Sequence, residues 1–308
     1  MRVLRGGPQD WDDAPGTAAV ALGVFDGVHL GHRAVIAEAV NRPGLVPAVL
    51  TFGTHPAALL SPAGPPPMLT TLERRLELIE ALGVAVAAVI DFDEQLRALP
   101  PDAFIASYLL DGLEARHVVA GEDFRFGNQA AGTVAMLQEV GQRRGFGVTA
   151  VGAVSSGAHE VRSTTIRSLL ASGEVAEAAA FLGRPHELPG RVVRGDGRGR
   201  TIGVPTANLD IPEGLAVPGS GVYVVTVTSP AGSAAGVANI GVRPTFEGTV
   251  PIVEVHLLDF EGDLYGKALT VGFVERIRDE RRFDSADALV GQIRDDIAIA
   301  RVRLRRTP

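Results

Sequence analysis

The chain has 308 residues, a formal net charge of −7, 46% apolar residues and no cysteine. A chain of this length exceeds the size at which one hydrophobic core usually stops growing, so we expect two domains. The absence of cysteine excludes disulfides, thiolate nucleophiles and metal sites with cysteine ligands. No stretch reaches the roughly 18 apolar residues that a bilayer span requires, so we expect no membrane partner and a cytoplasmic location.

The basic residues are almost all arginine, and Lys267 is the one lysine of the sequence. The Walker phosphate loop and the protein kinases both use a lysine at the phosphates, so neither class fits. Any ATP chemistry must therefore use arginine, histidine, backbone amides and metal. We interpret the C-terminal cluster Arg301–Arg306 as the last turn of a helix, where cations offset the helix dipole, and expect no nucleic-acid partner.

The first half of the sequence alternates short apolar runs with helical periods, which predicts a parallel sheet covered by helices. The expected strands are Ala18–Val24, Val46–Phe52, Val84–Asp91, Val118–Gly121 and Gly147–Val151. One helix is expected to begin near Gly31, a second to cover Leu72–Leu82 and a third to lie near Thr133–Arg144. Two more are expected at Thr164–Leu170 and Val175–Leu182. We predict an open α/β domain over residues 1–183, in which ligands gather at the carboxyl ends of the strands.

After Gly183-Arg184-Pro185 the helical periods end, and short β-rich segments follow between Gly and Pro turns. These segments are Gly190–Val193, Gly221–Thr228, Ala235–Ile240, Ile252–Leu258 and Ala268–Phe273. The pattern predicts a small antiparallel β-barrel over residues 184–308, closed by a final helix at about Ser285–Leu304.

The first strand leads into the string Gly23-Val24-Phe25-Asp26-Gly27-Val28-His29-Leu30-Gly31-His32, and a helix follows directly. Glycines at 27 and 31 let the backbone approach a phosphate closely, while a helix N-terminus offers free N–H groups and a positive dipole end. His29 and His32 are three residues apart, so both imidazoles can face one phosphate. The alternatives are a zinc pair, which needs further ligands, or two solvated histidines. The string as a whole indicates transfer of a nucleotidyl group from ATP.

Two further strings lie later in the same half of the chain. In Arg162-Ser163-Thr164-Thr165-Ile166-Arg167, Ser163 or Thr164 can cap a helix while Arg167 supplies charge to phosphate oxygens. An ordinary N-cap is the alternative. The string Gly121-Glu122-Asp123-Phe124-Arg125-Phe126-Gly127-Asn128 begins where a strand leaves the sheet. Its aromatic side chains and arginine could line a planar ligand, or it could be a structural loop.

In chain order, Val24–His32, Thr51–Pro56, Gly121–Gly127 and Ser163–Arg167 resemble the adenylyltransferase module of the prokaryotic bifunctional riboflavin kinase/FMN adenylyltransferases, the FAD synthetases. The resemblance implies a Rossmann-like nucleotidyltransferase domain, in which the phosphate of FMN attacks the α-phosphorus of ATP and pyrophosphate leaves. It implies that His29 and His32 stabilise charge on the transferring group. It implies that ATP and its phosphates are bound by Gly23, Phe25, Asp26, Gly31, Ser163, Thr164 and Arg167. It implies that the flavin is bound by Asp123, Phe124 and Phe126.

The second domain holds a separate set of candidate residues. Gly195–Gly203 contains four glycines and two arginines in nine residues, which suits a flexible flap over phosphates. Thr206 and Asn208, two apart on an extended stretch, can offer two neutral oxygens to Mg²⁺, although Thr and Asn are also common turn residues. Glu254 lies on an otherwise apolar strand, where a carboxylate can act as general base or simply face solvent.

Pro205–Asn208, Gly236–Phe246, Pro251–Phe260 and Leu264–Gly266 resemble the riboflavin kinase module of the same family. The resemblance implies that Glu254 takes the proton from the ribityl 5′-hydroxyl of riboflavin, while Thr206 and Asn208 bind the Mg²⁺ that ATP carries. Positioning and charge neutralisation then do most of the chemistry. We further expect Gly203 and Arg200 at the phosphates and Arg278 near the flavin.

The sequence thus predicts a bifunctional enzyme that converts riboflavin to FMN and FMN to FAD, with ATP as co-substrate and Mg²⁺ as cofactor. We expect a monomer or weak homo-oligomer with only these small molecules as partners. One alternative is a riboflavin kinase with an impaired adenylyltransferase module, because Ala130, Thr133 and Arg162 depart from the residues common in the family. The other is a flavin-binding regulator without turnover, against which the intact histidine string and Glu254 argue.

Overall fold

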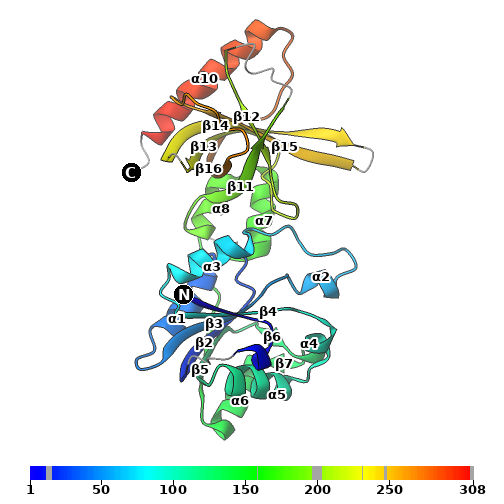
Figure 1. Ribbon diagram of the computed structural model, residues 1–308, viewed down its shortest axis with the longest axis vertical. Helices are drawn as coiled ribbons and strands as arrows, with labels where there is room; N and C mark the ends of the chain where they lie inside the picture. Colours follow the sequence, from blue (N-terminus) through cyan, green and yellow to red (C-terminus); the bar gives the residue numbers. More distant parts are fainter. Residues whose placement is uncertain (12–15, 158, 196–202, 231, 246–247, 306–308) are drawn as a thin grey trace. The chain divides into compact units, whose positions relative to one another are not determined.

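The computed structural model describes residues 1–308 except 12–15, 158, 196–202, 231, 246–247 and 306–308. The chain divides into two compact units, Met1–Ser163 and Thr164–Pro308 (Figure 1). Each unit has its own sheet and its own hydrophobic core. The domain boundary predicted after residue 183 lies inside the second unit, beyond two helices.

The first unit is built on a six-stranded sheet in the order β1-β4-β3-β2-β5-β8, in which every neighbouring pair is parallel. The strands are β1 (Arg2–Arg5), β2 (Ala18–Leu22), β3 (Val46–Phe52), β4 (Val86–Ile90), β5 (Ala115–Gly121) and β8 (Gly147–Val151). β2 and β4 are buried along their whole length, which explains why their sequences are continuous apolar runs. The predicted parallel sheet is confirmed, and β1 adds an edge strand that the sequence pattern did not predict.

Helices cover both faces of this sheet. They are α1 (Leu30–Val40), α2 (Ala57–Leu60), α3 (Leu72–Glu80), α4 (Glu94–Ala98), α5 (Pro101–Phe104), the π-helix η2 (Ile105–Gly112) and α6 (Val134–Arg144). The shorter elements are η1 (Pro8–Asp10), η3 (Asn128–Ala130) and two hairpins, β6 (Arg125–Phe126) with β7 (Gly132–Thr133) and β9 (Ser155–Ser156) with β10 (His159–Glu160).

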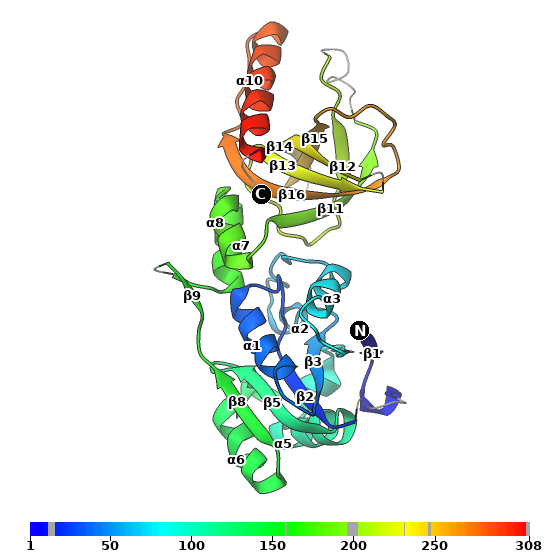
Figure 2. The same cartoon turned by 90° about the vertical axis from the view of Figure 1, so that its left-hand side faces the viewer.

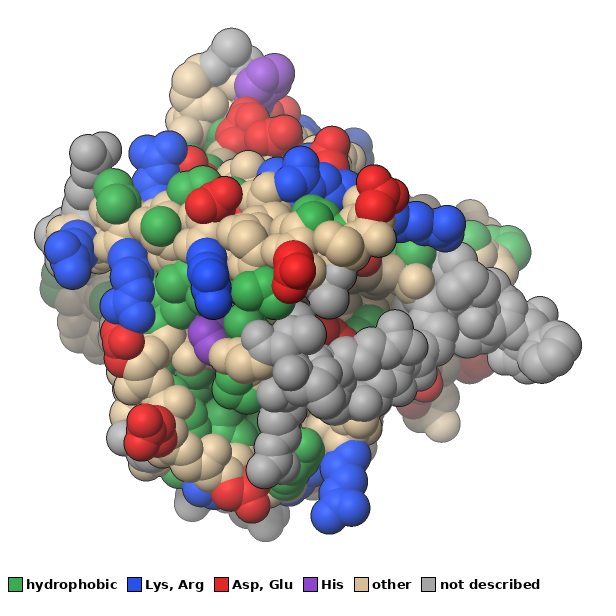
Figure 3. Space-filling view, turned by 90° about the horizontal axis from the view of Figure 1, so that it is seen from above, with side chains coloured by type: hydrophobic (Ala, Val, Ile, Leu, Met, Phe, Trp, Pro, Cys, Tyr) green, Lys and Arg blue, Asp and Glu red, His purple; other side chains and the backbone are tan. Residues whose placement is uncertain are grey.

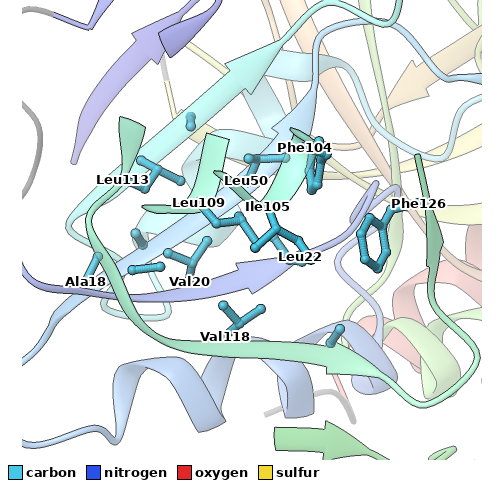
Figure 4. Close-up of a cluster of buried hydrophobic side chains, with 14 of the residues drawn as sticks. Ala18, Val20, Leu22, Leu50, Phe104, Ile105, Leu109, Leu113, Val118 and Phe126 are labelled. Atoms are coloured by element: carbon cyan, nitrogen blue, oxygen red, sulfur yellow. The ribbon is translucent and has the colours of Figure 1, made fainter. Parts of the chain in front are cut away.

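Alternate residues of β2 enter two different cores. Val20 belongs to the cluster of Leu109 from η2 (Figure 4), whereas Ala19 and Ala21 belong to the cluster of Ile36 from α1. α3 shares the second cluster and α6 the first, so the connections change face between the neighbouring strands β2 and β5. In open parallel sheets, such a point opens a crevice at the carboxyl ends of the two strands, where ligands bind.

The second unit contains a closed six-stranded barrel in the order β11-β12-β15-β14-β13-β16, in which all neighbours are antiparallel. The strands are β11 (His186–Val193), β12 (Ala207–Asp210), β13 (Gly221–Ser229), β14 (Gly232–Thr245), β15 (Gly248–Leu257) and β16 (Ala268–Arg278). The helices are α7 (Ser163–Ser172), whose first residue belongs to the first unit, α8 (Val175–Leu182) and α10 (Ala286–Leu304). The predicted barrel with a final helix is confirmed.

α10 lies against one side of the barrel in both Figure 1 and Figure 2. Its Ala300 is fully buried in a cluster with Val222 and Val224 of β13. Three ion pairs link the helix to the barrel region, Arg278 with Asp296 at 2.8 Å, Arg301 with Asp259 at 2.6 Å and Arg303 with Glu275 at 3.1 Å. Of the predicted basic cluster, Arg301 and Arg303 lie in the last turn of α10 and also attach the helix, whereas Arg306 lies outside the described residues.

Figure 3 shows basic, acidic and apolar side chains interspersed on the face of the molecule seen from above. A folded protein normally exposes such a mixture, because its polar surface is too small to cover every apolar group. Among the helices that the structure describes, none combines the length and the apolarity needed to cross a membrane.

Candidate active sites

The first candidate site lies where β2 and β5 end, at the point where the connections change face. β2 leads through residues 23–29 into α1, and β5 leads into residues 122–124. We call residues 23–32 the histidine turn. His29 is the N-cap of α1, so the turn ends on the N-terminus of an 11-residue helix, which favours bound anions.

The backbone of the histidine turn adopts conformations that residues other than glycine rarely take. The φ angle is 55° at Phe25, 83° at Gly27 and 43° at Val28. For a β-branched residue such as Val28 this is a true outlier, and each non-glycine case costs about 1–3 kcal/mol. Gly23 is also required, because a Cβ there would lie 2.9 Å from the Phe25 ring. Strain of this kind persists where the surrounding structure over-determines it, which is typical of functional sites.

Asp26 holds the turn from the inside. Asp26 is only 2% exposed. Its carboxylate accepts hydrogen bonds from the backbone N–H groups of Leu69 (2.9 and 3.1 Å) and Thr70 (3.3 Å). The N–H of Gly27 donates in turn to the Thr70 hydroxyl at 3.3 Å. The segment before α3 therefore fixes the turn through buried polar contacts, and Asp26 contributes to its shape.

The two imidazoles of the turn lie in nearly parallel planes. Their ring centroids are 3.5 Å apart at an interplanar angle of 19°, and the Phe25 ring meets His32 edge-on at 5.4 Å. His29 is 5% exposed, and its Nδ1 accepts a hydrogen bond from the backbone N–H of His32 at 3.3 Å. A neutral imidazole that accepts at Nδ1 carries its proton on Nε2, so His29 can donate from Nε2 to a phosphate oxygen.

The zinc alternative for this pair gains no support from the described part of the chain. Within those residues, no group of three or more His, Asp or Glu side chains is arranged to hold a metal ion. Gly31 lies close to the pair, since a Cβ there would approach the His29 ring at 3.2 Å. The His29 ring thus packs closely against the backbone of Gly31, where a side chain would crowd it.

The predicted phosphate residues of α7 are divided between the two units. Ser163 belongs to the first unit, and its hydroxyl donates to the backbone carbonyl of Asp26 at 3.1 Å. Ser163 is therefore joined directly to the histidine turn. Thr164 and Arg167 belong to the second unit, on the same helix.

The loop after β5 carries the predicted flavin residues of the first unit. Asp123 is exposed and pairs with Arg162 at 3.1 Å, and Arg162 also pairs with Glu160 at 2.7 Å. Phe124 is half-buried and stacks on Phe126 at 6.1 Å. Phe126 itself is 7% exposed and belongs to the hydrophobic core. It therefore packs against Phe124 from the core side and does not lie at the surface.

The second candidate site includes a row of three polar side chains across the barrel. Glu254 of β15 is directly opposite Asn208 of β12 on one side and Asn239 of β14 on the other. All three are half-buried, whereas Val253 and Val255, which alternate with Glu254, are fully buried. Sequence analysis predicted Asn208 and Glu254 as functional. The strand register adds Asn239, which no local pattern singles out.

A pocket of about 430 Å³, within the size range of small-molecule sites, is lined by Ala207 and Val255, the chain neighbours of Asn208 and Glu254. Its lining is mostly apolar and includes Val255, Leu257, Phe260 and Tyr265. The predicted metal residue Thr206, which is exposed and precedes β12, lines the same pocket. Thr206 and Asn208 are thus close in sequence, but only Asn208 lies in the polar row.

The remaining predicted residues of the second unit have different surroundings. Gly203 is exposed with a φ of 77°, and Arg200 lies outside the described residues. Arg278 donates from Nε and Nη2 to the Asp296 carboxylate at 2.8 to 3.2 Å, and so attaches α10 to the barrel. The start of the flap lies against the polar row, because a Cβ on Gly195 would approach the side-chain nitrogen of Asn208 at 2.2 Å.

Two family models match the chain in the order that the sequence predicted, FAD synthetase over residues 12–165 and riboflavin kinase over residues 182–304. A curated relative from Bacillus subtilis (strain 168), named bifunctional riboflavin kinase/FMN adenylyltransferase, is 39% identical over 91% of this chain and 90% of its own length. Relatives of the same name are 40% identical in Pseudomonas fluorescens, over 91% of both chains, and 38% identical in Escherichia coli (strain K12), over 98% of this chain and 97% of the relative.

A solved structure described as a macrolide-efflux protein from Streptococcus pneumoniae matches with a TM-score of 0.90 and 33% sequence identity. The match covers 98% of this chain and 99% of that one, so the fold is shared over essentially the whole length. The predicted family and fold class are therefore confirmed. The chain belongs to the bifunctional riboflavin kinase/FMN adenylyltransferase family.

Proposed function

We propose that this chain makes FMN from riboflavin and ATP at the barrel, and FAD from FMN and ATP at the histidine turn. One observation carries the proposal: each compact unit has its own set of facing polar groups. His29 and His32 stack in the first unit, and Asn208 and Glu254 oppose each other in the second. The modules that we assign are residues 1–183 for adenylyl transfer and 184–308 for the kinase.

In adenylyl transfer, an oxygen of the FMN phosphate attacks the α-phosphorus of ATP, the bond to pyrophosphate breaks, and no covalent enzyme intermediate forms. His29 donates from Nε2 to an oxygen of the transferring group, and His32 lies stacked against it. Donors fixed before the reaction stabilise developing charge without reorganisation, which supports this role. The other ATP residues are Gly23, Phe25, Asp26 and Gly31, which shape the turn, and Ser163, Thr164 and Arg167, which hold the outer phosphates.

We assign FMN in this reaction to the loop after β5. Asp123 and Phe124 follow the strand that forms one side of the crevice, and the half-buried Phe124 ring offers a face for the flavin. Phe126 fixes Phe124 by stacking from the core. An aromatic ring held in this way loses little conformational freedom when a planar ligand binds.

In the kinase reaction, Glu254 accepts the proton of the ribityl 5′-hydroxyl while that oxygen attacks the γ-phosphorus of ATP, and ADP leaves. Enzymes that transfer phosphoryl or adenylyl groups from ATP generally work with a divalent metal ion, and we propose Mg²⁺. The Thr206 hydroxyl and the Asn208 amide offer two neutral oxygens, and Mg²⁺ typically takes few protein ligands beside phosphate oxygens and water. When bound, the ion neutralises charge on the phosphates.

The apolar pocket that Thr206 lines suits the adenosine part of this ATP. Its volume and its aromatic side chain Tyr265 fit a purine, and Thr206 would lie between the base and the phosphates. We assign Gly203 and Arg200, of which Arg200 lies outside the described residues, to the phosphates, and Arg278 to the flavin. We propose that the protein works in the cytoplasm, where ATP is available, as a monomer or weak homo-oligomer with no nucleic-acid or membrane partner.

A product time course tests both reactions. The purified chain is incubated with riboflavin, ATP and Mg²⁺, and riboflavin, FMN and FAD are separated at intervals. We expect FMN to accumulate first and FAD to follow. FMN without FAD, also when FMN is supplied directly, would limit the chain to the kinase activity, and unchanged riboflavin would leave only a binding role.

A further inference from the structure

A buried arginine lies directly behind the histidine turn. Arg75, in the first turn of α3, is 1% exposed. Its Nη1 donates to the backbone carbonyl of Val24 at 2.8 Å, and its Nη2 donates to the backbone carbonyl of Phe52 at 2.5 Å. Val24 and Phe52 stand at the carboxyl ends of the neighbouring strands β2 and β3. One guanidinium therefore joins the starts of the two loops that leave these strands.

The charge of Arg75 is expensive to bury. Burial lowers the pKa of Arg75, because desolvation disfavours the charged form, and the Asp26 carboxylate opposes this shift. No described carboxylate is hydrogen-bonded to the guanidinium, which donates to two neutral carbonyls instead. With an apolar side chain in this place, the carbonyls of Val24 and Phe52 would lose this donor. The guanidinium therefore serves a purpose at these two positions.

The position of Arg75 indicates that purpose. Val24 is the second residue of the turn, and its carbonyl also accepts from the Thr51 hydroxyl at 2.9 Å. The next residue, Phe25, has the strained φ of 55° and meets the His32 ring edge-on. Fixing the Val24 carbonyl therefore fixes the peptide from which the strained turn starts. Asp26, two residues after Val24, holds the same turn through the backbone N–H groups of Leu69 and Thr70.

We propose that Arg75 is a positioning residue for adenylyl transfer. Its guanidinium holds the backbone where the chain leaves β2 and β3, so that the two imidazoles keep their stacked geometry. The proposal rests on the charge-stabilising role of His29 and His32 given above. Lysine cannot replace this function fully, because an ammonium group is a point charge and does not span two carbonyls in fixed geometry.

The test uses the full chain, because its two activities serve as controls for each other. Arg75→Met, Arg75→Lys and Thr51→Val are compared with the wild type and with Arg74→Met, which changes the neighbouring arginine that pairs with Glu77 on the same helix. FAD formation from FMN and ATP gives kcat and KM for ATP, and FMN formation from riboflavin reports on the barrel. Trp11, the single tryptophan of the chain, lies buried in the first unit and reports on its folding by fluorescence.

We expect Arg75→Met to lower kcat for FAD formation by about a hundredfold with KM for ATP nearly unchanged, because a small displacement of aligned groups has an effect of this size. Arg75→Lys should recover part of the loss. Thr51→Val should lower kcat by about fivefold, since it removes one neutral hydrogen bond to the same carbonyl. FMN formation should remain at the wild-type rate in all variants, and Arg74→Met should keep both activities.

Wild-type kcat in Arg75→Met with native Trp11 fluorescence would overturn the proposal. If Arg75→Met loses the native fluorescence, Arg75→Lys decides: a lowered kcat in a folded first unit supports positioning, and a wild-type kcat contradicts it. Equal losses in Lys and Met variants, together with a raised KM and altered Trp11 fluorescence, would mean a purely structural role. A wild-type chain that makes no FAD from FMN would refute the adenylyltransferase assignment itself, which separates the two claims.

Discussion

The two candidate sites are held in different ways. The histidine turn consists of consecutive residues, and buried polar groups such as Asp26 and Arg75 fix its strained backbone. The row of Asn208, Glu254 and Asn239 comes from three strands of a closed barrel, and strand register alone brings these side chains together. The first site should therefore depend also on a residue such as Arg75 that does not meet substrate, whereas the second should depend mainly on residues that do.

The largest effect is expected at Glu254, where the comparison is simplest. Glu254→Gln should lower FMN formation by about a thousandfold, because removing a general base typically costs 10²- to 10⁴-fold. FAD formation from supplied FMN should remain unchanged, because that reaction uses the other unit. The measurement is the initial rate of each reaction with saturating ATP. Glu213→Gln, on an exposed turn of the second unit, is the matched control and should keep both rates. Loss of both activities in Glu254→Gln would mean that the two sites are not independent.

At the histidine turn, removal of one imidazole should lower FAD formation and leave FMN formation unchanged. Replacing His29 should lower FAD formation by about 10²- to 10³-fold, as for the loss of one preorganised donor, while FMN formation continues. His29 also caps α1, since its Nδ1 accepts from the His32 N–H. His29→Ala removes the cap as well, at about 1 kcal/mol of stability, whereas His29→Asn can retain it.

The pair of variants thus separates capping from chemistry. Equal activity losses in His29→Ala and His29→Asn, with different unfolding midpoints of the first unit by Trp11 fluorescence, would support a direct role at the phosphates. Full activity in His29→Asn would reduce His29 to a cap and remove the basis of the proposed mechanism.

Much of the fold follows from local sequence patterns. The runs of β2 and β4 could be predicted because both faces of a parallel sheet are covered, and the change to short β-rich segments after residue 183 marked the barrel. The edge strand β1 and the π-helix Ile105–Gly112 were missed. Four residues carry little periodicity, and no helix is predicted between the strands expected at Val84–Asp91 and Val118–Gly121.

The candidate sites were predictable only where their residues are contiguous. The histidine string is one segment, so its glycines and histidines could be recognised together. Arg75 and Asn239 could not be recognised in this way. Arg75 matters through a hydrogen bond to Val24, 51 residues away in the chain, and Asn239 matters through strand register. An arginine of a short amphipathic helix and an asparagine in a β-rich segment have no local signal.

A histidine of the second unit sharpens the comparison, because it is buried without contacting either site. His186, at the start of β11, is 1% exposed, and its Nε2 donates to the Ala216 carbonyl at 2.8 Å. Burial lowers the pKa of His186 from 6.5 to about 4, against the opposing effect of that hydrogen bond. Between these values the unfolded chain binds a proton that the folded barrel does not. The free energy of unfolding should therefore fall as the pH falls from 6.5 through 4.

At pH 4.5 the loss from His186 should amount to about 2–3 kcal/mol, which is the larger part of the total for such a shift. Urea unfolding followed by circular dichroism at pH 7 and pH 4.5 measures it, in the wild type and in His186→Gln. Glutamine keeps an N–H donor and does not titrate, so the variant should lose less stability on acidification by that amount. The same loss in both proteins would show that His186 is not the titrating group.

The smallest effect concerns the adenosine pocket. Tyr265 is 57% exposed at the pocket, and the guanidinium carbon of Arg194 lies 5.8 Å from the centre of its ring. If the adenine of the kinase ATP stacks on this ring, Tyr265→Ala should raise KM for ATP in FMN formation by about tenfold, since base–aromatic stacking contributes about 1–3 kcal/mol. Tyr265→Phe keeps the ring face and should behave as the wild type.

Because adenine stays bound in the same way from substrate to transition state, kcat should not change in Tyr265→Ala. An unchanged KM would mean that adenine binds elsewhere on the barrel. The contrast with Arg75 then becomes measurable within one chain. At Tyr265, loss of the contact should raise KM at constant kcat, because this side chain meets the part of ATP that does not react. At the histidine turn, loss of a buried support should lower kcat at constant KM, because the support acts only through the geometry of the groups that react.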